Sequence, residues 1–268
     1  MLACQKLGNV TGRATKVAAV ERVADWDAQW TAEPLDLRAP DAEARTPRWR
    51  AQERIVRERF GSFRGLGVVE LGAGRGLNAL LYGQRGARVS LLDLSPLVLA
   101  QAKELFAAHG VEAGLVEGDV FDLPAAVRDR FDVSMSFGLC EHFLGERRRR
   151  VVAAHLQALR PGGVAMLGVP NRFSPVYRLW MGALKARGSW PLGTEEPFSA
   201  GELAALARSA GGEPLEPAYG SFAASVVNHG VNQLLFKLGR KGLPVPQVRV
   251  PGLDRLGYEL LLPVVRPA

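Results

Sequence analysis

The stretch Val68-Val69-Glu70-Leu71-Gly72-Ala73-Gly74-Arg75-Gly76 decides how this chain folds. A short apolar run passes directly into a glycine-rich turn, and a helical pattern follows from Leu77. Glycine lets the backbone turn tightly and lets a ligand lie against bare main chain. The stretch therefore predicts a strand, a turn and a helix, with a ligand site at the turn.

A second acidic residue strengthens this prediction. Asp93 follows the next apolar run, 21 positions after Gly72, which is the spacing at which a carboxylate meets a ribose diol in a nucleotide-binding βαβ unit. The dinucleotide fingerprint G-x-G-x-x-G would need a glycine at Leu77. The pattern here is E-x-G-x-G-x-G, and Glu70 beside the turn suits a cationic ligand, such as one bearing an ammonium and a sulfonium, better than a pyrophosphate.

Predicted strands and helices continue to alternate along the chain beyond the first unit. Short apolar strands that alternate with helices predict an α/β fold with a doubly wound, mostly parallel sheet. Ser95 is the predicted N-cap of the helix from Pro96, and Ser199 that of a helix running to Ala210. The predicted strands span residues 67–71, 87–92, 114–117, 131–137, 164–169 and 257–265, and the other predicted helices span 77–85 and 146–159.

Two regions frame this core. Residues 1–65 read as a helical N-terminal preface or lid, and residues 66–268 as the Rossmann-like catalytic domain, with residues 171–198 as an inserted lid. Residues 213–250 give no clear pattern. Trp26 and Trp30 lie one helical turn apart, and Pro47 to Phe60 is helical.

From residue 66 to residue 170 the motifs resemble the class I S-adenosylmethionine (AdoMet)-dependent methyltransferases. The stretches 68–76, 91–95, 118–124 and 131–143 are similar to that family's first four motifs, and 159–163 to the turn before its fifth strand. The resemblance implies AdoMet as the methyl donor and S-adenosylhomocysteine as the product. It places the cofactor on Glu70, Gly72, Gly74, Gly76, Asp93, Leu94, Asp119, Val120, Phe137 and Gly138.

Methyl transfer from a sulfonium is an in-line displacement, so the protein must align donor and acceptor and remove a proton where the acceptor carries one. His142 follows the fourth strand, where the resemblance places the transferring methyl, and imidazole titrates near neutral pH. His142 is the candidate base, and Glu141 would orient it or bind substrate. The alternative is a structural His142 that caps a helix or pairs with Glu141. Cys140 is expected to be a buried thiol, because its context does not match that of a nucleophile.

The predicted lid is rich in aromatic residues. It would cover a flat or greasy acceptor and exclude water; alternatively, it is a packed helical insertion. Its aromatic residues are Phe173, Tyr177, Trp180, Trp190 and Phe198. The tryptophans of the preface would form the opposite wall of the pocket or belong to the helix's own packing face; they are Trp26, Trp30 and Trp49.

Composition excludes several classes of protein. Two cysteines, Cys4 and Cys140, do not make a disulfide framework or a cysteine-built metal cage, and no metal site is expected. No run reaches the roughly 18 to 20 apolar residues of a membrane helix, and the N-terminus lacks a secretory h-region, so the cytoplasm is the expected compartment. The net charge of +7 fits either a face for nucleic acid, anionic lipid or an acidic substrate, or arginine-rich solvated faces such as Arg147–Arg150.

These observations predict methyl transfer to a small-molecule acceptor, through an oxygen, nitrogen or carbon atom, in specialised metabolism. A methyltransferase acting on RNA or another polyanion and a non-catalytic AdoMet-binding module are the alternatives, and a nicotinamide oxidoreductase is disfavoured by the glycine spacing. The sequence leaves the oligomeric state open.

Overall fold

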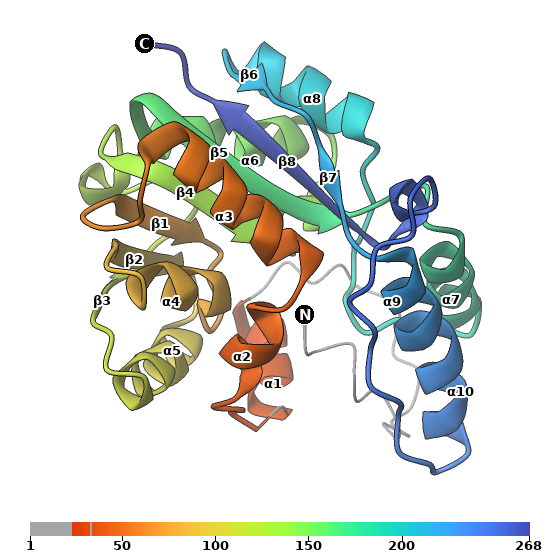
Figure 1. The fold of residues 1–268 in the computed structure, drawn as a ribbon. Coiled ribbons are helices and arrows are strands. Elements are labelled where there is room, and N and C mark those ends of the chain that lie inside the picture. The colour runs from red at the N-terminus through yellow and green to blue at the C-terminus, as the bar shows by residue number, and fades with distance from the viewer. Residues whose placement is uncertain (1–22, 33) are drawn as a thin grey trace.

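The computed structural model describes residues 23–32 and 34–268 (Figure 1). Cys4 and the first part of the predicted preface lie outside them. The described strands form one sheet in the order β3-β2-β1-β4-β5-β8-β6, with β7 paired to β8. They are β1 (Gly67–Leu71), β2 (Arg88–Asp93), β3 (Ala113–Glu117), β4 (Phe131–Phe137), β5 (Leu159–Pro170), β6 (Glu213–Pro214), β7 (Ala218–Tyr219) and β8 (Glu259–Val265).

Strands β1 to β5 pair in parallel, whereas β8 runs antiparallel to β5, β6 and β7. The predicted doubly wound, mostly parallel sheet is confirmed. Strand order reverses between β1 and β4, and in such sheets ligands bind at the carboxyl ends of the strands beside that reversal.

Helices cover both faces of the sheet because its strands carry apolar side chains on both sides. One face packs against α3 (Pro47–Phe60), α4 (Leu77–Gly83) and α5 (Pro96–Ala108), and the other against α6 (Gly145–Ala158) and α8 (Ala200–Ser209). Ser95 and Ser199 cap α5 and α8 as predicted, each accepting a backbone N–H at 3.1 Å.

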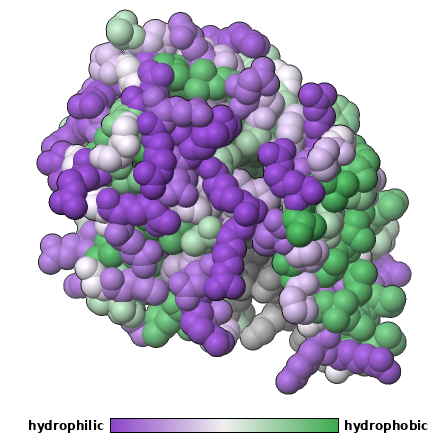
Figure 2. Space-filling model, in the orientation of Figure 1, coloured by the Kyte–Doolittle hydropathy of each residue, from purple (hydrophilic) through white to green (hydrophobic). Residues whose placement is uncertain are grey.

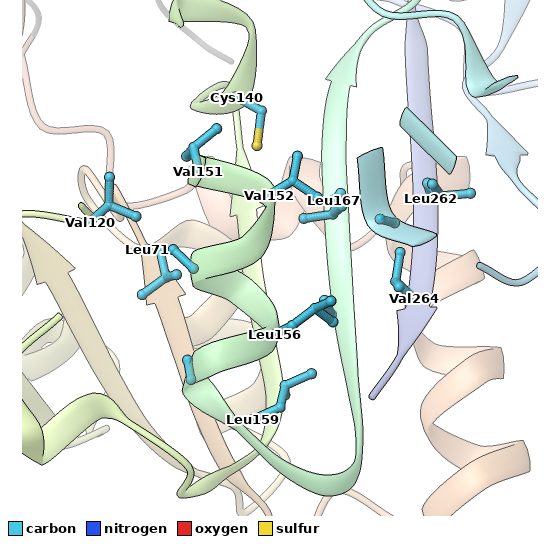
Figure 3. Packing of buried hydrophobic residues seen from close by; sticks show 14 of the residues in the cluster. Leu71, Val120, Cys140, Val151, Val152, Leu156, Leu159, Leu167, Leu262 and Val264 are labelled. Carbon is cyan, nitrogen blue, oxygen red and sulfur yellow. The ribbon is translucent and has the colours of Figure 1, made fainter. Parts of the chain in front are cut away.

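Side chains along each strand point alternately to the two faces of the sheet, and β5 is an example. Along β5, Val164 and Met166 point to the α3 side, while Ala165 and Leu167 point to the α6 side. Figure 3 shows Val152 and Leu156 of α6 directed toward β5 and β8. All of these side chains are at most 5% exposed, so a hydrophobic core lies on each face of the sheet.

The described part of the preface is helical, as predicted. It contains α1 (Val23–Ala32), α2 (Ala39–Glu43) and α3. Trp49, expected either on the wall of the pocket or on the packing face of its helix, is 1% exposed, stacks on Phe63 and meets Tyr82 edge-on. It belongs to the packing face of α3. Trp26 and Trp30 both lie on α1.

The C-terminal third differs most from the prediction. The segment 171–198, for which no helix was assigned, contains α7 (Pro175–Ala186). The unassigned residues 213–250 contain β6, β7, α9 (Phe222–Val226), a π-helical turn at Val227–Val231 and α10 (Asn232–Lys237). Single-turn 3₁₀ helices occupy Ala125–Val127, Cys140–His142 and Asp254–Leu256.

The arginine run on α6 is also not wholly solvated. Arg148 is 7% exposed, stacks over the ring of Phe198 and pairs with Glu202 at 2.9 Å, whereas its neighbours Arg147 and Arg149 are exposed. The expectation of a solvated face is therefore wrong for Arg148. None of the helices within residues 23–32 and 34–268 combines the length and apolar character needed to cross a bilayer.

Candidate active site

A cavity of about 740 Å³ opens at the carboxyl ends of β1, β2 and β4, beside the reversal in strand order. The glycine-rich turn after β1 and the loops after β2, β3 and β4 form its floor, and α1 lies over it through Trp26 and Trp30. Its volume suits a nucleoside-sized ligand together with a second small molecule. All ten residues that the sequence assigned to the cofactor line this cavity, as do Glu141 and His142.

The glycine-rich turn exposes its backbone to the cavity. Gly72 and Gly74 have φ angles of 58° and 53°, a region that side chains disfavour. A Cβ on Gly72 would lie 2.6 Å from Leu139, and one on Gly74 would lie 2.7 Å from Trp30. Both positions therefore require glycine, and the turn fits a ligand that lies flat against main chain.

Glu70 lies at the end of β1, 4% exposed, and accepts the backbone N–H of Ala79 at 2.9 Å. It thus satisfies an amide in the first turn of α4. Burial raises the pKa of Glu70 to about 8, against the smaller opposing effects of the Ala79 hydrogen bond and the Arg48 charge. The carboxyl is mostly protonated at neutral pH, and a cationic ligand in the cavity would favour its charged form.

Asp93 ends β2 and organises the adjacent turn. One oxygen accepts the N–H of Gly74 at 2.9 Å and the other accepts the N–H of Ser95 at 3.0 Å. Burial raises the pKa of Asp93, and these backbone hydrogen bonds oppose that shift. Each carboxylate oxygen keeps a further lone pair, so both oxygens can accept hydroxyl groups from a ligand.

The loops after β2 and β3 complete this half of the cavity. Leu94 is 48% exposed and Val120 is 6% exposed, giving apolar surface on which a flat ring can lie. Asp119 accepts the N–H of Phe121 at 2.8 Å, which fixes its carboxylate at the cavity edge.

His142 belongs to the other half. Its Nδ1 lies 2.8 Å from the carbonyl oxygen of Thr194, and since a carbonyl only accepts, Nδ1 donates and Nε2 carries the lone pair. The edge of Trp26 meets the ring with centroids 4.8 Å apart. Burial lowers the pKa of His142 to about 4, so the ring is neutral at pH 7. Thr194, rather than Glu141, orients the imidazole.

Two buried carboxyls face this half of the cavity. Glu141 is 3% exposed, and its Oε2 has no hydrogen-bond partner. Glu195 is 2% exposed and accepts the hydroxyl hydrogen of Tyr177. Burial raises the pKa of Glu195 to about 7, and burial together with the charge of Glu195 raises that of Glu141 well above its usual value.

Sequence reasoning missed Glu195 and Thr194. Both lie in the segment after α7, and only the fold brings them to the loop after β4, where Glu196 donates its N–H to the Glu141 carbonyl at 2.9 Å. The available signal for Glu195 was the pair Glu195-Glu196, the two acidic residues of segment 171–198. Arg48, Tyr258 and Glu259 also line the cavity and were not anticipated.

The predicted aromatic lid lines the cavity through few of its residues. Tyr177, Trp180 and Trp190 pack in a cluster of their own, and Phe173 is 63% exposed. Segment 171–198 reaches the cavity through Leu192 and Glu195. The alternative of a packed helical insertion describes most of it.

Helix α1 closes the cavity more directly. Arg75, within the glycine-rich turn, donates to the carbonyl oxygens of Trp30 and Pro34 at 3.1 and 3.2 Å. Gln29 donates to the carbonyl of Pro191 at 2.9 Å, so α1 bridges the turn and the segment after α7.

Cys140 lies behind the cavity and takes no part in its surface. It is 0% exposed, and burial raises the pKa of its thiol to about 12. A buried, protonated thiol is not a nucleophile, which agrees with the sequence expectation.

Comparison with known proteins places these features in a family. Residues 68–163 match the family model described as a methyltransferase domain. Two ubiquinone biosynthesis O-methyltransferases are similar: that of Bordetella avium is 32% identical over 59% of this chain and 67% of its own length, and that of Cronobacter sakazakii is 31% identical over 44% and 47%. The chain spans about half to three fifths of the length of the first curated relatives that it matches.

A solved structure agrees on the fold. The Burkholderia thailandensis 1,6-didemethyltoxoflavin-N1-methyltransferase, with 1,6-didemethyltoxoflavin and S-adenosylhomocysteine bound, superposes with a TM-score of 0.56 at 18% identity over 96% of this chain and 94% of that one. The family match, the relatives and the motif-lined cavity agree, and the chain belongs to the class I AdoMet-dependent methyltransferases.

Proposed function

We propose that this chain transfers the methyl group of AdoMet to an oxygen of a small-molecule acceptor. The observation that carries the proposal is the single cavity joining two unlike halves: a glycine turn with Asp93 on one side, and His142 with two buried carboxyls on the other. The O-methyltransferase names of the similar chains support oxygen as the acceptor atom.

The residues present fit AdoMet. Gly72 and Gly74 leave room for a ligand against the backbone, both Asp93 oxygens can accept ribose hydroxyls, and Val120 offers apolar surface to the adenine. Glu70 supplies negative charge near the turn when it ionises. When bound, AdoMet supplies a methyl group on a positively charged sulfur.

The other half of the cavity prepares the acceptor. A hydroxyl must lose its proton as the methyl transfers, and His142 Nε2 is the neutral acceptor that its Thr194 hydrogen bond leaves available. Glu141 and Glu195 line the same half of the cavity and give it polar surface near His142. Trp26 and α1 exclude water from the aligned pair.

A methyl-transfer assay tests this proposal. AdoMet labelled in its methyl group is incubated with the full chain and panels of phenols, aliphatic alcohols and amines, and separately with bulk RNA. Label transferred to a hydroxyl compound is the expected result, with Asp93→Asn needing more AdoMet for the same rate of transfer. Transfer to RNA alone would establish the polyanion alternative, and tight AdoMet binding without transfer to any panel would favour a non-catalytic module.

A further inference from the structure

One end of the molecule exposes an unusual amount of apolar side chain. The residues concerned are 38–75% exposed and come from α7, the π-helical turn, α10 and the loop after it. Figure 2 shows hydrophobic side chains gathered over α9, α10 and the adjoining edge of the molecule. We call this the α7–α10 surface, and its residues are Leu179, Val231, Leu234, Leu238 and Leu243.

These leucines are not needed to hold the helices together. The inner sides of α7 and the π-helical turn pack through an aromatic cluster, in which His229 lies 5.1 Å from Tyr177 and 5.2 Å from Trp180 between ring centroids. Val176 of α7 lies against Gly230 of the π-helical turn, so α7 adjoins this turn, which continues into α10. The helices are thus packed on one side and bare on the other.

The segments that build this surface are basic, although Arg172 and Arg249 pair with Glu202 and Asp254 outside them. Residues 172–194 and 217–253 contain eight arginines and lysines and no aspartate or glutamate. Lys237, Arg240 and Lys241 are exposed beside Leu238 and Leu243. An apolar surface with exposed cations beside it has the pattern of a segment that lies on an anionic lipid surface, with its leucines among the acyl chains and its cations at the headgroups.

Two other occupants fit the charge less well. A second copy docked through the same surface would bring cations against cations. Residues 1–22 carry four basic residues and one acidic one, so they would also add like charge.

We propose that the α7–α10 surface docks this chain on anionic phospholipid membranes. The aromatic cluster beneath the surface borders the cavity, because Tyr258 lines the cavity and lies 4.4 Å from Tyr177 between ring centroids. Docking therefore brings the cavity close to the lipid. The inference goes beyond methyl transfer and does not depend on it.

Sedimentation with unilamellar vesicles tests the proposal. The full chain is mixed with vesicles of phosphatidylcholine alone and of phosphatidylcholine with about one third phosphatidylglycerol. It is expected to sediment with the anionic vesicles, and less so in high salt. Leu234→Ser with Leu238→Ser should abolish sedimentation, and glutamine at Lys237, Arg240 and Lys241 should weaken it about a hundredfold.

Matched controls separate the surface from general effects. Leu97→Ser and Leu115→Ser remove exposed leucines from α5 and β3, and glutamine at Arg64, Lys103 and Arg208 removes three exposed cations elsewhere. These controls should sediment as the unmodified chain does. AdoMet affinity, measured on every variant, reports that the fold is intact and separates a failure here from a failure of the proposed activity.

Three outcomes would overturn the proposal. In the first, the unmodified chain does not sediment with anionic vesicles. In the second, the leucine variant sediments as much as the unmodified chain, which would place the contact elsewhere on the chain, residues 1–22 included. In the third, light scattering shows a dimer that the leucine variant dissociates, which would make the surface an interface between copies.

Discussion

At the scale of the residue, the hydrogen bond between His142 and Thr194 fixes which ring nitrogen can accept a proton. We expect His142→Gln to lower kcat by about 10²–10⁴-fold, because the variant loses the proton acceptor at the acceptor half of the cavity. AdoMet affinity should change less than about twofold. Steady-state kinetics with calorimetry measure both. Unaltered turnover would assign His142 a structural role only.

Asp93 lies in the other half of the cavity, where its carboxylate holds the glycine-rich turn. Asp93→Asn should weaken AdoMet binding by about 10- to 100-fold, since hydrogen bonds to a charged acceptor are lost. Asp122→Asn, whose side chain is 90% exposed after β3, is the matched control. Calorimetric titration compares the two, and equal affinities would remove Asp93 from the cofactor site.

Glu70 gives a prediction about stability. Its pKa is raised to about 8 in the folded chain, so between about pH 4.5 and pH 8 the folded state binds more protons than the unfolded state, and stability falls as pH rises. In Glu70→Gln, the loss of unfolding free energy over this pH range should be smaller by roughly a few kcal/mol. Urea unfolding at pH 6 and pH 9 measures it. A variant with the same pH dependence as the unmodified chain contradicts the assignment.

At the scale of the element, Arg75 ties α1 to the glycine-rich turn through the carbonyls of Trp30 and Pro34. Arg75→Gln should speed amide exchange in α1 and weaken AdoMet binding several-fold, because α1 no longer closes the cavity. Arg54→Gln on α3, where Arg54 pairs with Glu58 in solvent, is the control. Exchange in α1 that equals the control would show that Arg75 does not hold it.

The elements also show what sequence alone can predict. Strands β1 and β2 were predictable because they are short, mostly apolar runs that end at Gly72 and Asp93. Helix α7 and residues 213–250 were not, since their order depends on a tertiary cluster built around Tyr177, Trp180 and His229. The same dependence hid Thr194 and Glu195, which only the fold brings to the loop after β4.

At the scale of the whole molecule, the predicted fold class and family are confirmed, while the interpretation of the net positive charge changes. Composition allowed a basic face or dispersed solvated arginines. The structure buries Arg148 within the arginine run, and it leaves Lys237, Arg240 and Lys241 exposed beside bare leucines. Charge content is a property of the sequence, but its placement relative to apolar surface is a property of the fold.

The most direct test of the central account is calorimetric titration of the full chain with AdoMet, S-adenosylhomocysteine and NADH. The geometry of Gly72, Gly74 and Asp93 predicts dissociation constants on the order of micromolar for the first two and no binding of NADH. Binding of NADH alone, or of none of the three, would contradict the assignment of this cavity to AdoMet.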